Sequence, residues 1–178
     1  VALAVSVRLA RQLADADPDQ AKGILDQLGV DLQEAVQELR NLAHGIYPPL
    51  LMDRGLGEAL AAAAGRAALP TVVEADGIGR YPQPVEAAVY FCVLEALQNA
   101  GKHAGAGAQV TITLHEEEGA LLFEVVDDGA GFDLGTGAHH GHGFVNMSDR
   151  VGAFGGSISV DAAPGRGTRV SGRLPLAG

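Results

Sequence analysis

The stretch that decides the fold is residues 85–132, VEAAVYFCVLEALQNAGKHAGAGAQVTITLHEEEGALLFEVVDDGAGF. Its first part follows two prolines and predicts a long helix over 85–103. Apolar and polar residues then alternate over 109–115, and a second apolar segment follows at 121–126. The turn residues at 116–119 lie between these two segments, so the pattern predicts a β-hairpin packed with a helix.

The segments on either side supply further helices and strands. An Ala-rich helix is expected over 55–68 and a short strand over 71–75. Downstream, we expect a helix over 144–154 and two strands over 157–161 and 168–174. Several helices and a mostly antiparallel set of strands predict an α+β sandwich with the helices on one face.

The first 50 residues have a different, purely helical pattern. Residues 1–15 resemble the end of a helix, and Asp17 followed by Pro18 predicts the start of a second helix. This second helix has apolar residues at heptad spacing, which are Leu25, Leu28, Leu32, Ala35, Leu39 and Leu42. A single amphipathic helix lying on its own domain is one interpretation. The regular spacing favours a hairpin that pairs with a second copy, so we predict a helical hairpin with linker over 1–50 and a catalytic domain over 51–178.

Composition excludes several classes of function. The net charge of -10 argues against a general nucleic-acid or membrane-surface binder, because no basic patch dominates. Cys92 is the only cysteine and lies among apolar residues, which indicates a small buried hydrophobe in a reducing compartment. No apolar run reaches the roughly 18 residues that span a bilayer. The chain does not begin with Met, so we expect a fragment of a longer protein.

Polar residues recur along one face of the helix at 85–103. Glu95, Asn99 and His103 stand at steps of four, and Lys102 is close to the same edge. An Asn carbonyl with phosphate oxygens suits Mg²⁺, a carboxylate one turn away can act as a base, and a lysine can neutralise phosphate. Such spacing also occurs on an ordinary solvated helix face.

Three glycine-containing segments follow in order. Asp127 ends an apolar strand before Gly129 and Gly131. Its carboxylate can accept a hydrogen bond from the exocyclic amine of adenine, whereas guanine has a carbonyl oxygen at that place and would be repelled. Gly141 and Gly143 precede or open a helix, where free amides attract phosphate. A last turn, Gly165-Arg166-Gly167, leads into Thr168. Each segment taken alone also fits a simple turn.

Taken together, these motifs resemble those of a known family. In order and spacing they are similar to the nucleotide-binding boxes of the GHKL ATPases, in the form found in nitrate-sensor-like sensor histidine kinases. The matching segments are Glu95-x-x-x-Asn99-x-x-Lys102-His103, Asp127-x-Gly129-x-Gly131-Phe132, Gly141-x-Gly143-Phe144-x-x-Met147-x-x-Arg150 and Gly165-x-Gly167-Thr168. Residues 38–60 resemble the second dimerisation helix and its linker. The resemblance implies a Bergerat-type ATP-binding sandwich.

The resemblance also implies a role for each matching residue in binding ATP. Asp127 would hold the adenine amine, Gly129 and Gly131 would shape the pocket, and Thr168 would support it. At the other end, Asn99 would bind Mg²⁺ between the phosphates.

Further roles concern the reaction. Glu95 would act as base or orient water, Lys102 and His103 would face the phosphates, and Gly141 and Gly143 would hinge a lid. Family members transfer the ATP γ-phosphate to a histidine of the first dimerisation helix and then to a response-regulator aspartate. The resemblance also implies that the parent protein is a homodimer and that this part of it lies in the cytoplasm. Both membrane-anchored and unanchored parent proteins are compatible with the resemblance.

Departures from the family pattern are few. Asp128 stands where many members carry Asn, and Phe144 where many carry Leu. Residues 1–15 contain no histidine, so we expect the fragment to lack its own phosphorylation site. His44 matches a linker position. The cluster His139, His140 and His142 is interpreted as part of a solvated lid rather than as a metal site.

Other members of this fold, and one other class of function, are alternatives. An anti-sigma-type serine kinase would lack the heptad helix, and a topoisomerase- or chaperone-type ATPase carries a further domain with a catalytic lysine. From another class, the chain could be a nucleotide-binding dimeric interaction module without kinase activity. A measurement of nucleotide binding would distinguish the kinase from the interaction module.

Overall fold

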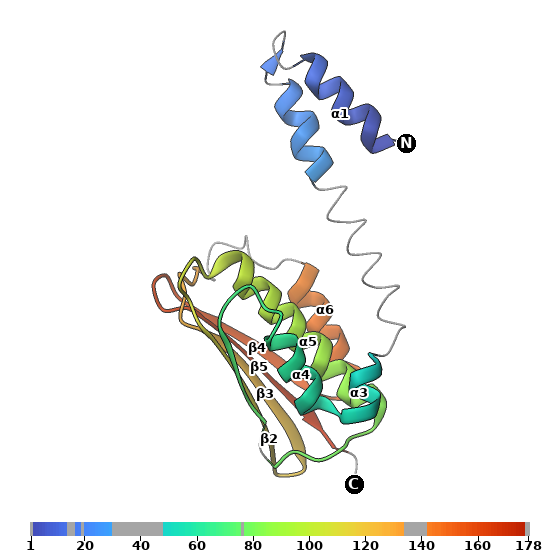
Figure 1. Cartoon of the computed structure of the whole chain (residues 1–178), viewed down its shortest axis with the longest axis vertical. Coiled ribbons are helices and arrows are strands. Elements are labelled where there is room, and N and C mark those ends of the chain that lie inside the picture. The colour runs from blue at the N-terminus through green and yellow to red at the C-terminus, as the bar shows by residue number, and fades with distance from the viewer. Residues whose placement is uncertain are drawn as a thin grey trace. The chain divides into compact units, whose positions relative to one another are not determined.

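The chain forms two compact units, Val1–Tyr47 and Pro48–Gly178. The computed structural model describes residues 2–13, 17–18, 20–29, 48–75, 77–133 and 142–176, and Figure 1 shows their secondary structure. The first unit contains α1 (Ala2–Leu13) and a second helix over residues 20–29. The Oδ1 atom of Asp17 accepts a hydrogen bond from the Gln20 backbone N at 3.1 Å, which confirms the predicted helix start. The later heptad positions, from Leu32 onward, lie outside the described residues.

The second unit is a five-stranded sheet with helices on one face (Figure 1). The strand order is β1-β2-β3-β5-β4, and only the β1–β2 pair is parallel. The strands are β1 (Thr71–Glu74), β2 (Val110–Glu117), β3 (Ala120–Asp127), β4 (Ser157–Ala162) and β5 (Thr168–Pro175). The helices are α3 (Pro49–Arg54), α4 (Leu56–Ala64), α5 (Gln83–His103) and α6 (His142–Gly152). The predicted α+β class and its mostly antiparallel sheet are confirmed.

Alternation along the strands places the core between sheet and helices. Every second residue of β2 is buried up to Leu114, and β3 follows the same pattern around Phe123. The Phe123 ring occupies the space that a side chain at its cross-strand partner, Gly172, would fill. Leu60 of α4 and Val93 of α5 are fully buried in the same unit. Burial of such side chains, at roughly 25 cal/mol per Å², holds the helices on the sheet.

One helix was not predicted from the sequence. The pattern of residues 1–50 predicts a helical hairpin and a linker, whereas α3 begins within this linker at Pro49. Proline fits the first turn of a helix because that position has no intrahelical partner for its N–H, so Pro49 can begin α3. The helix expected over 55–68 begins at Leu56 and ends at Ala64, after Gly55 at φ 83°.

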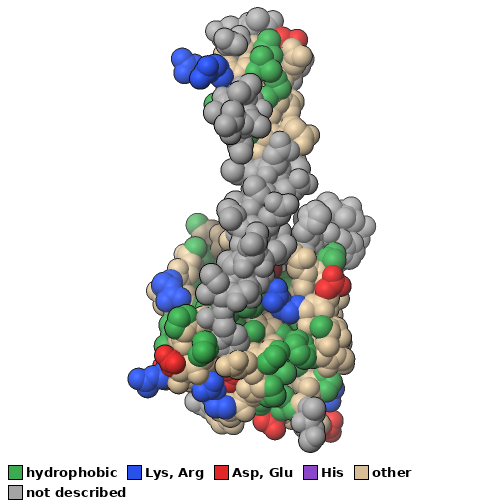
Figure 2. All heavy atoms as spheres, turned by 90° about the vertical axis from the view of Figure 1, so that its right-hand side faces the viewer, with side chains coloured by type: hydrophobic (Ala, Val, Ile, Leu, Met, Phe, Trp, Pro, Cys, Tyr) green, Lys and Arg blue, Asp and Glu red, His purple; other side chains and the backbone are tan. Residues whose placement is uncertain are grey.

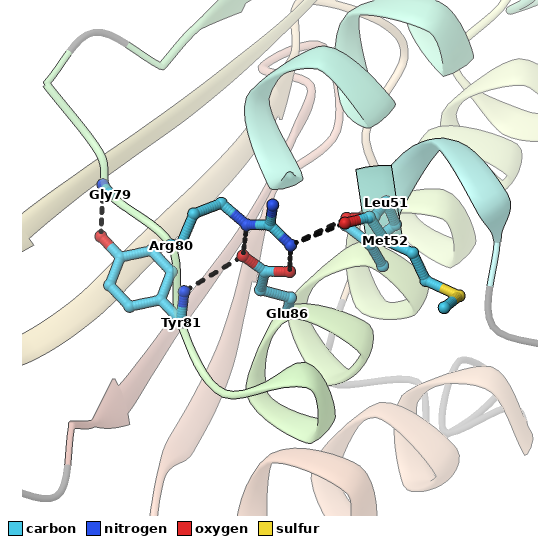
Figure 3. Close-up of polar contacts among 6 residues, drawn as sticks. All are labelled: Leu51, Met52, Gly79, Arg80, Tyr81 and Glu86. Atoms are coloured by element: carbon cyan, nitrogen blue, oxygen red, sulfur yellow. Dashed lines mark hydrogen bonds and ion pairs between the residues drawn. The ribbon is translucent and has the colours of Figure 1, made fainter. Parts of the chain in front are cut away.

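Polar contacts hold the carboxyl end of the short helix α3. Leu51 is fully buried, but Leu50 and Met52 are exposed. Figure 2 shows hydrophobic side chains gathered on one side of the second unit. The Arg80 guanidinium donates to the carbonyl oxygen of Met52 at 2.9 Å and to that of Leu51 at 3.4 Å (Figure 3). Six residues would not normally persist as a helix without such tertiary support.

A buried carboxylate fixes that guanidinium in place. The Glu86 side chain is fully buried, and its Oε1 accepts from Arg80 Nε at 2.9 Å and from the Tyr81 backbone N at 3.1 Å. Its Oε2 lies 3.4 Å from a second Arg80 nitrogen, so the pair is bidentate (Figure 3). Since Glu86 belongs to the first turn of α5, this ion pair connects α3, the segment before α5 and α5 itself.

Cys92 is buried in α5, as its sequence context predicts. Burial raises the pKa of the Cys92 thiol to about 12, with Arg150 opposing and Glu95 adding to the shift. Its Sγ lies 3.8 Å from the carbonyl oxygen of Met147 on α6. The thiol therefore stays protonated and acts as a packing group between two helices.

This burial makes stability depend on pH in the alkaline range. The unfolded thiol ionises near its usual pKa of about 8.5, whereas the folded one stays neutral, so unfolding releases a proton and stability falls as pH rises. Between pH 8 and 10 we expect wild type to lose about 1.9 kcal/mol more unfolding free energy than Cys92→Ala. Urea titrations of both proteins at the two pH values measure this difference, and parallel losses would contradict it.

Candidate functional site

A cavity of about 560 Å³ opens between the sheet, α5 and α6. Its volume falls within the roughly 300–1,000 Å³ typical of small-molecule sites. Helix α5 forms one wall, strands β3, β4 and β5 another, and the start of α6 a third. The lining residues include Glu95, Ala96, Asn99, Ala100, His103, Val125, Asp127, Gly131, Phe132, Gly143, Phe144, Met147, Val160, Thr168 and Val170.

The polar face of α5 lies along this cavity. Glu95, Asn99 and His103 all line it, because steps of four keep them on one side of the helix. The opposite side of α5 packs into the core through residues such as Val89 and Val93. Lys102 is exposed and is not among the described residues that line the cavity.

The carboxylate of Asp127 lies at the inner side of the cavity. Asp127 is only 6% exposed, although it ends β3. Its Oδ1 accepts a hydrogen bond from the Gly129 backbone N at 3.0 Å. Thr168 is its direct cross-strand partner on β5, so the two side chains stand next to each other in the lining. This pair offers a buried charged acceptor and a hydroxyl to a ligand.

Two glycines allow the loop after β3 to pack tightly. A Cβ at Gly129 would overlap Ala104 at the end of α5, and Gly131 has φ 58° and faces the Ala163 carbonyl. The Ala130 backbone N donates to the Ala104 carbonyl at 2.8 Å. Gly131 lines the cavity, whereas Gly129 supports the loop from outside the described lining. Both positions require a residue without a side chain.

The third wall is the start of α6. Gly143, Phe144 and Met147 line the cavity, and Arg150 lies over the Phe91 ring, 5.1 Å from its centroid, which ties α6 to α5. Gly141 lies outside the described residues, as do His139 and His140, so most of the predicted lid falls in the segment 134–141 that is not described. In the part of the chain that is described, no group of three or more His, Cys, Asp or Glu side chains is placed to hold a metal ion.

The apolar part of the lining was not predicted from the sequence. Val125, Val160 and Val170 come from three strands and line the same cavity as Asp127. Their residue type gives no signal, since valines on strands normally belong to the core. Phe144 and Met147 were noted as motif residues but not as part of the site.

Comparisons with known proteins show the family of this chain. The sequence model described as "Histidine kinase-, DNA gyrase B-, and HSP90-like ATPase" matches residues 85–178, and a model described as "Histidine kinase" matches residues 1–51. The chain belongs to the histidine kinases. In particular, the cavity of this histidine kinase lies within the matched ATPase region, so the family implies an ATP site there.

Named relatives of this histidine kinase are sensor proteins. It is 31% identical to the sensor histidine kinase MctS of Rhizobium johnstonii over 96% of the chain, and 27% identical to the sensor protein VraS of Staphylococcus haemolyticus over 91%. The matches span 39% and 46% of those proteins, so the chain covers less than half their length.

Structures of other histidine kinases share the fold. The histidine kinase domain of the blue-light activated kinase from Erythrobacter litoralis superposes with a TM-score of 0.57 at 24% identity, covering 96% of this chain and 82% of that one. The kinase AdeS of Acinetobacter baumannii gives a TM-score of 0.60 at 14% identity, covering 99% and 96%. Among the described helices, none is long and apolar enough to cross a membrane.

Proposed function

We propose that this chain binds Mg²⁺-ATP in the cavity and serves as the kinase core of a longer sensor protein. The γ-phosphate would pass to a histidine of the parent dimer and then to an aspartate of a response regulator. The observation that carries the proposal is the meeting of a buried carboxylate, Asp127, with the polar row Glu95, Asn99 and His103 in one cavity. We assign residues 1–50 to the dimerisation hairpin and linker, and 51–178 to the ATP-binding domain. A cytoplasmic location follows from this function.

The adenine end of the site is assigned to the sheet. Asp127 would accept a hydrogen bond from the exocyclic amine of adenine, and Thr168 beside it would support the same edge. The carbonyl of guanine would instead meet the carboxylate and be repelled. Gly129 and Gly131 would keep the loop close enough to contact the base.

The phosphate end is assigned to α5 and α6. The Asn99 side chain would supply an oxygen ligand to Mg²⁺, which neutralises charge on the phosphates when bound. Glu95 would accept the proton from the attacking imidazole, while the bond from the γ-phosphorus to the bridging oxygen breaks and ADP leaves. His103 and exposed Lys102 would face the phosphates, with Gly141 and Gly143 at the lid.

Calorimetric titration with nucleotide tests the proposed function. ATP should bind, GTP should bind much more weakly, and Mg²⁺ should strengthen ATP binding. A folded chain that binds no nucleotide in any of these titrations would contradict the proposal. The same result would favour the alternative of a dimeric interaction module without kinase activity.

Asn99→Ala is expected to remove the Mg²⁺-dependent part of ATP binding. The side chain lines the cavity but is only half-buried, so the fold should persist. In wild type, the contact between Asn99 and Mg²⁺ is worth about 1.5–3 kcal/mol, so adding Mg²⁺ should improve ATP affinity at least tenfold. In Asn99→Ala, which lacks this oxygen ligand, adding Mg²⁺ should improve ATP affinity by less than about twofold. Titrations with Mg²⁺ and with EDTA measure both ratios. Gln98→Ala, one residue away and outside the described lining, is the matched control.

A further inference from the structure

We infer that Gly143 is a positioning residue, whose missing side chain makes room for the carboxylate of Glu95 against the first turn of α6. The inference rests on the proposed function, because it concerns how the proposed base, Glu95, is held. It assigns to Gly143 a steric role toward Glu95, separate from any flexibility of the lid.

The backbone at Gly143 does not itself require glycine. The residue is the second of the 11 residues of α6, and its φ lies outside the left-handed region. Gly131 differs, since it has φ 58° and would meet backbone carbonyls. Any L-residue could adopt the conformation at 143, so the reason for glycine there must be what surrounds it.

The obstacle to a side chain at 143 is Glu95. In the described part of the chain, the three atoms nearest to an added Cβ all belong to Glu95. Such a Cβ would overlap Oε1 and would lie 3.2 Å from Cδ and 3.5 Å from Cγ. The carboxylate thus lies directly against the start of α6.

This position also suits Glu95 electrostatically. The first turn of α6 reads His-Gly-Phe-Val and brings no acidic residue of its own to the positive end of the helix dipole. Glu95 reaches that end from α5. Close packing against Gly143 therefore limits where the carboxylate can go, one turn from Asn99 in the same cavity.

A methyl group at 143 would displace the carboxylate, because the obstructing Oε1 is the free end of the Glu95 side chain. We expect Gly143→Ala to lower the melting temperature by about 1–3 °C through the loss of this contact with the helix end, and to weaken Mg²⁺-ATP binding by roughly tenfold. In the Glu95→Ala background the same substitution should raise the melting temperature by about 1–3 °C, because alanine is the better helix former. There its effect on ATP affinity should be less than twofold.

A double-mutant cycle of Gly143→Ala with Glu95→Ala, followed by thermal unfolding and by ATP titration, tests the inference. Glu95→Asp, which retains the charge on a shorter side chain, should also relieve most of the Gly143→Ala defect. Gly152→Ala is the matched control. It lies at the other end of α6 with no described atom within 4 Å of an added Cβ, so it should raise the melting temperature in both backgrounds.

If Gly143→Ala lowered the melting temperature and the ATP affinity equally with and without the Glu95 side chain, the inference would be overturned. Such a result would show that the backbone or the nucleotide requires glycine at this position. The melting temperatures are measured without nucleotide, so they do not depend on whether the chain binds ATP. A sign reversal in the melting temperatures with no ATP binding by any variant would therefore contradict the proposed function alone. No reversal in a chain that binds ATP would contradict the inference alone.

Discussion

Replacing Asp127 with alanine is expected to weaken ATP binding by roughly 100-fold, which corresponds to about 2–3 kcal/mol for a charge-assisted hydrogen bond in a dry site. Asp127 is 6% exposed, so water cannot readily replace its carboxylate at the proposed adenine edge. Its Oδ1 is used by the Gly129 backbone N, so the substitution should also cost about 1 kcal/mol of stability. Calorimetry measures the affinity, and thermal unfolding verifies that the variant is folded.

Two further variants sharpen this experiment. Asp127→Asn keeps an acceptor but adds an amide donor, which can pair with the guanine carbonyl, so it should narrow the preference for ATP over GTP. Asp161→Ala removes the same charge from an exposed position on β4 and should leave affinity unchanged. Superimposable ATP titrations for wild type and Asp127→Ala would remove Asp127 from the site.

Replacing Arg80 with alanine is expected to destabilise the second unit by about 2–3 kcal/mol, which lowers its melting temperature by roughly 10 °C. The substitution removes the guanidinium from the fully buried Glu86 carboxylate, which keeps the hydrogen bond from the Tyr81 backbone N. It also removes the side-chain donor from the Met52 and Leu51 carbonyl oxygens at the end of α3, although Leu51 keeps the hydrogen bond from the Gly55 backbone N. The value is below that of a fully buried pair, because the Arg80 side chain is 52% exposed.

A second ion pair provides the control for Arg80. Arg169 pairs with Glu124 on the sheet face, where both partners are partly exposed, so Arg169→Ala should change stability by less than about 1 kcal/mol. Denaturant unfolding of the three proteins gives the comparison. Equal, small losses for Arg80→Ala and Arg169→Ala would show that water satisfies Glu86 once the guanidinium is removed.

Local pattern was enough to predict most of the fold. Alternation around Ile112 and the apolar segment around Phe123 predicted two strands, which the structure confirms. Each strand faces the core on one side only. The helix α3 was missed since Pro48 and Pro49 carry a stop signal and a start signal at the same place.

The candidate site was less accessible to sequence reasoning. Polar residues at steps of four, such as Glu95 and Asn99, marked one wall in advance. The valines of the opposite wall carry no such mark, because their position at a cavity arises only when three strands come together. Burial of Glu86 was equally hidden, since an acidic residue in the first turn of a helix normally faces solvent.

The protected sulfur of Cys92 has a practical consequence for spectroscopy. As the single cysteine of the chain is buried and its pKa is about 12, maleimide reagents should leave it unmodified at neutral pH. A cysteine introduced at Val145, which is 49% exposed on α6, would then take up a fluorophore selectively. A single dye at position 145 can therefore report whether α6 moves when nucleotide binds, without prior removal of the native cysteine.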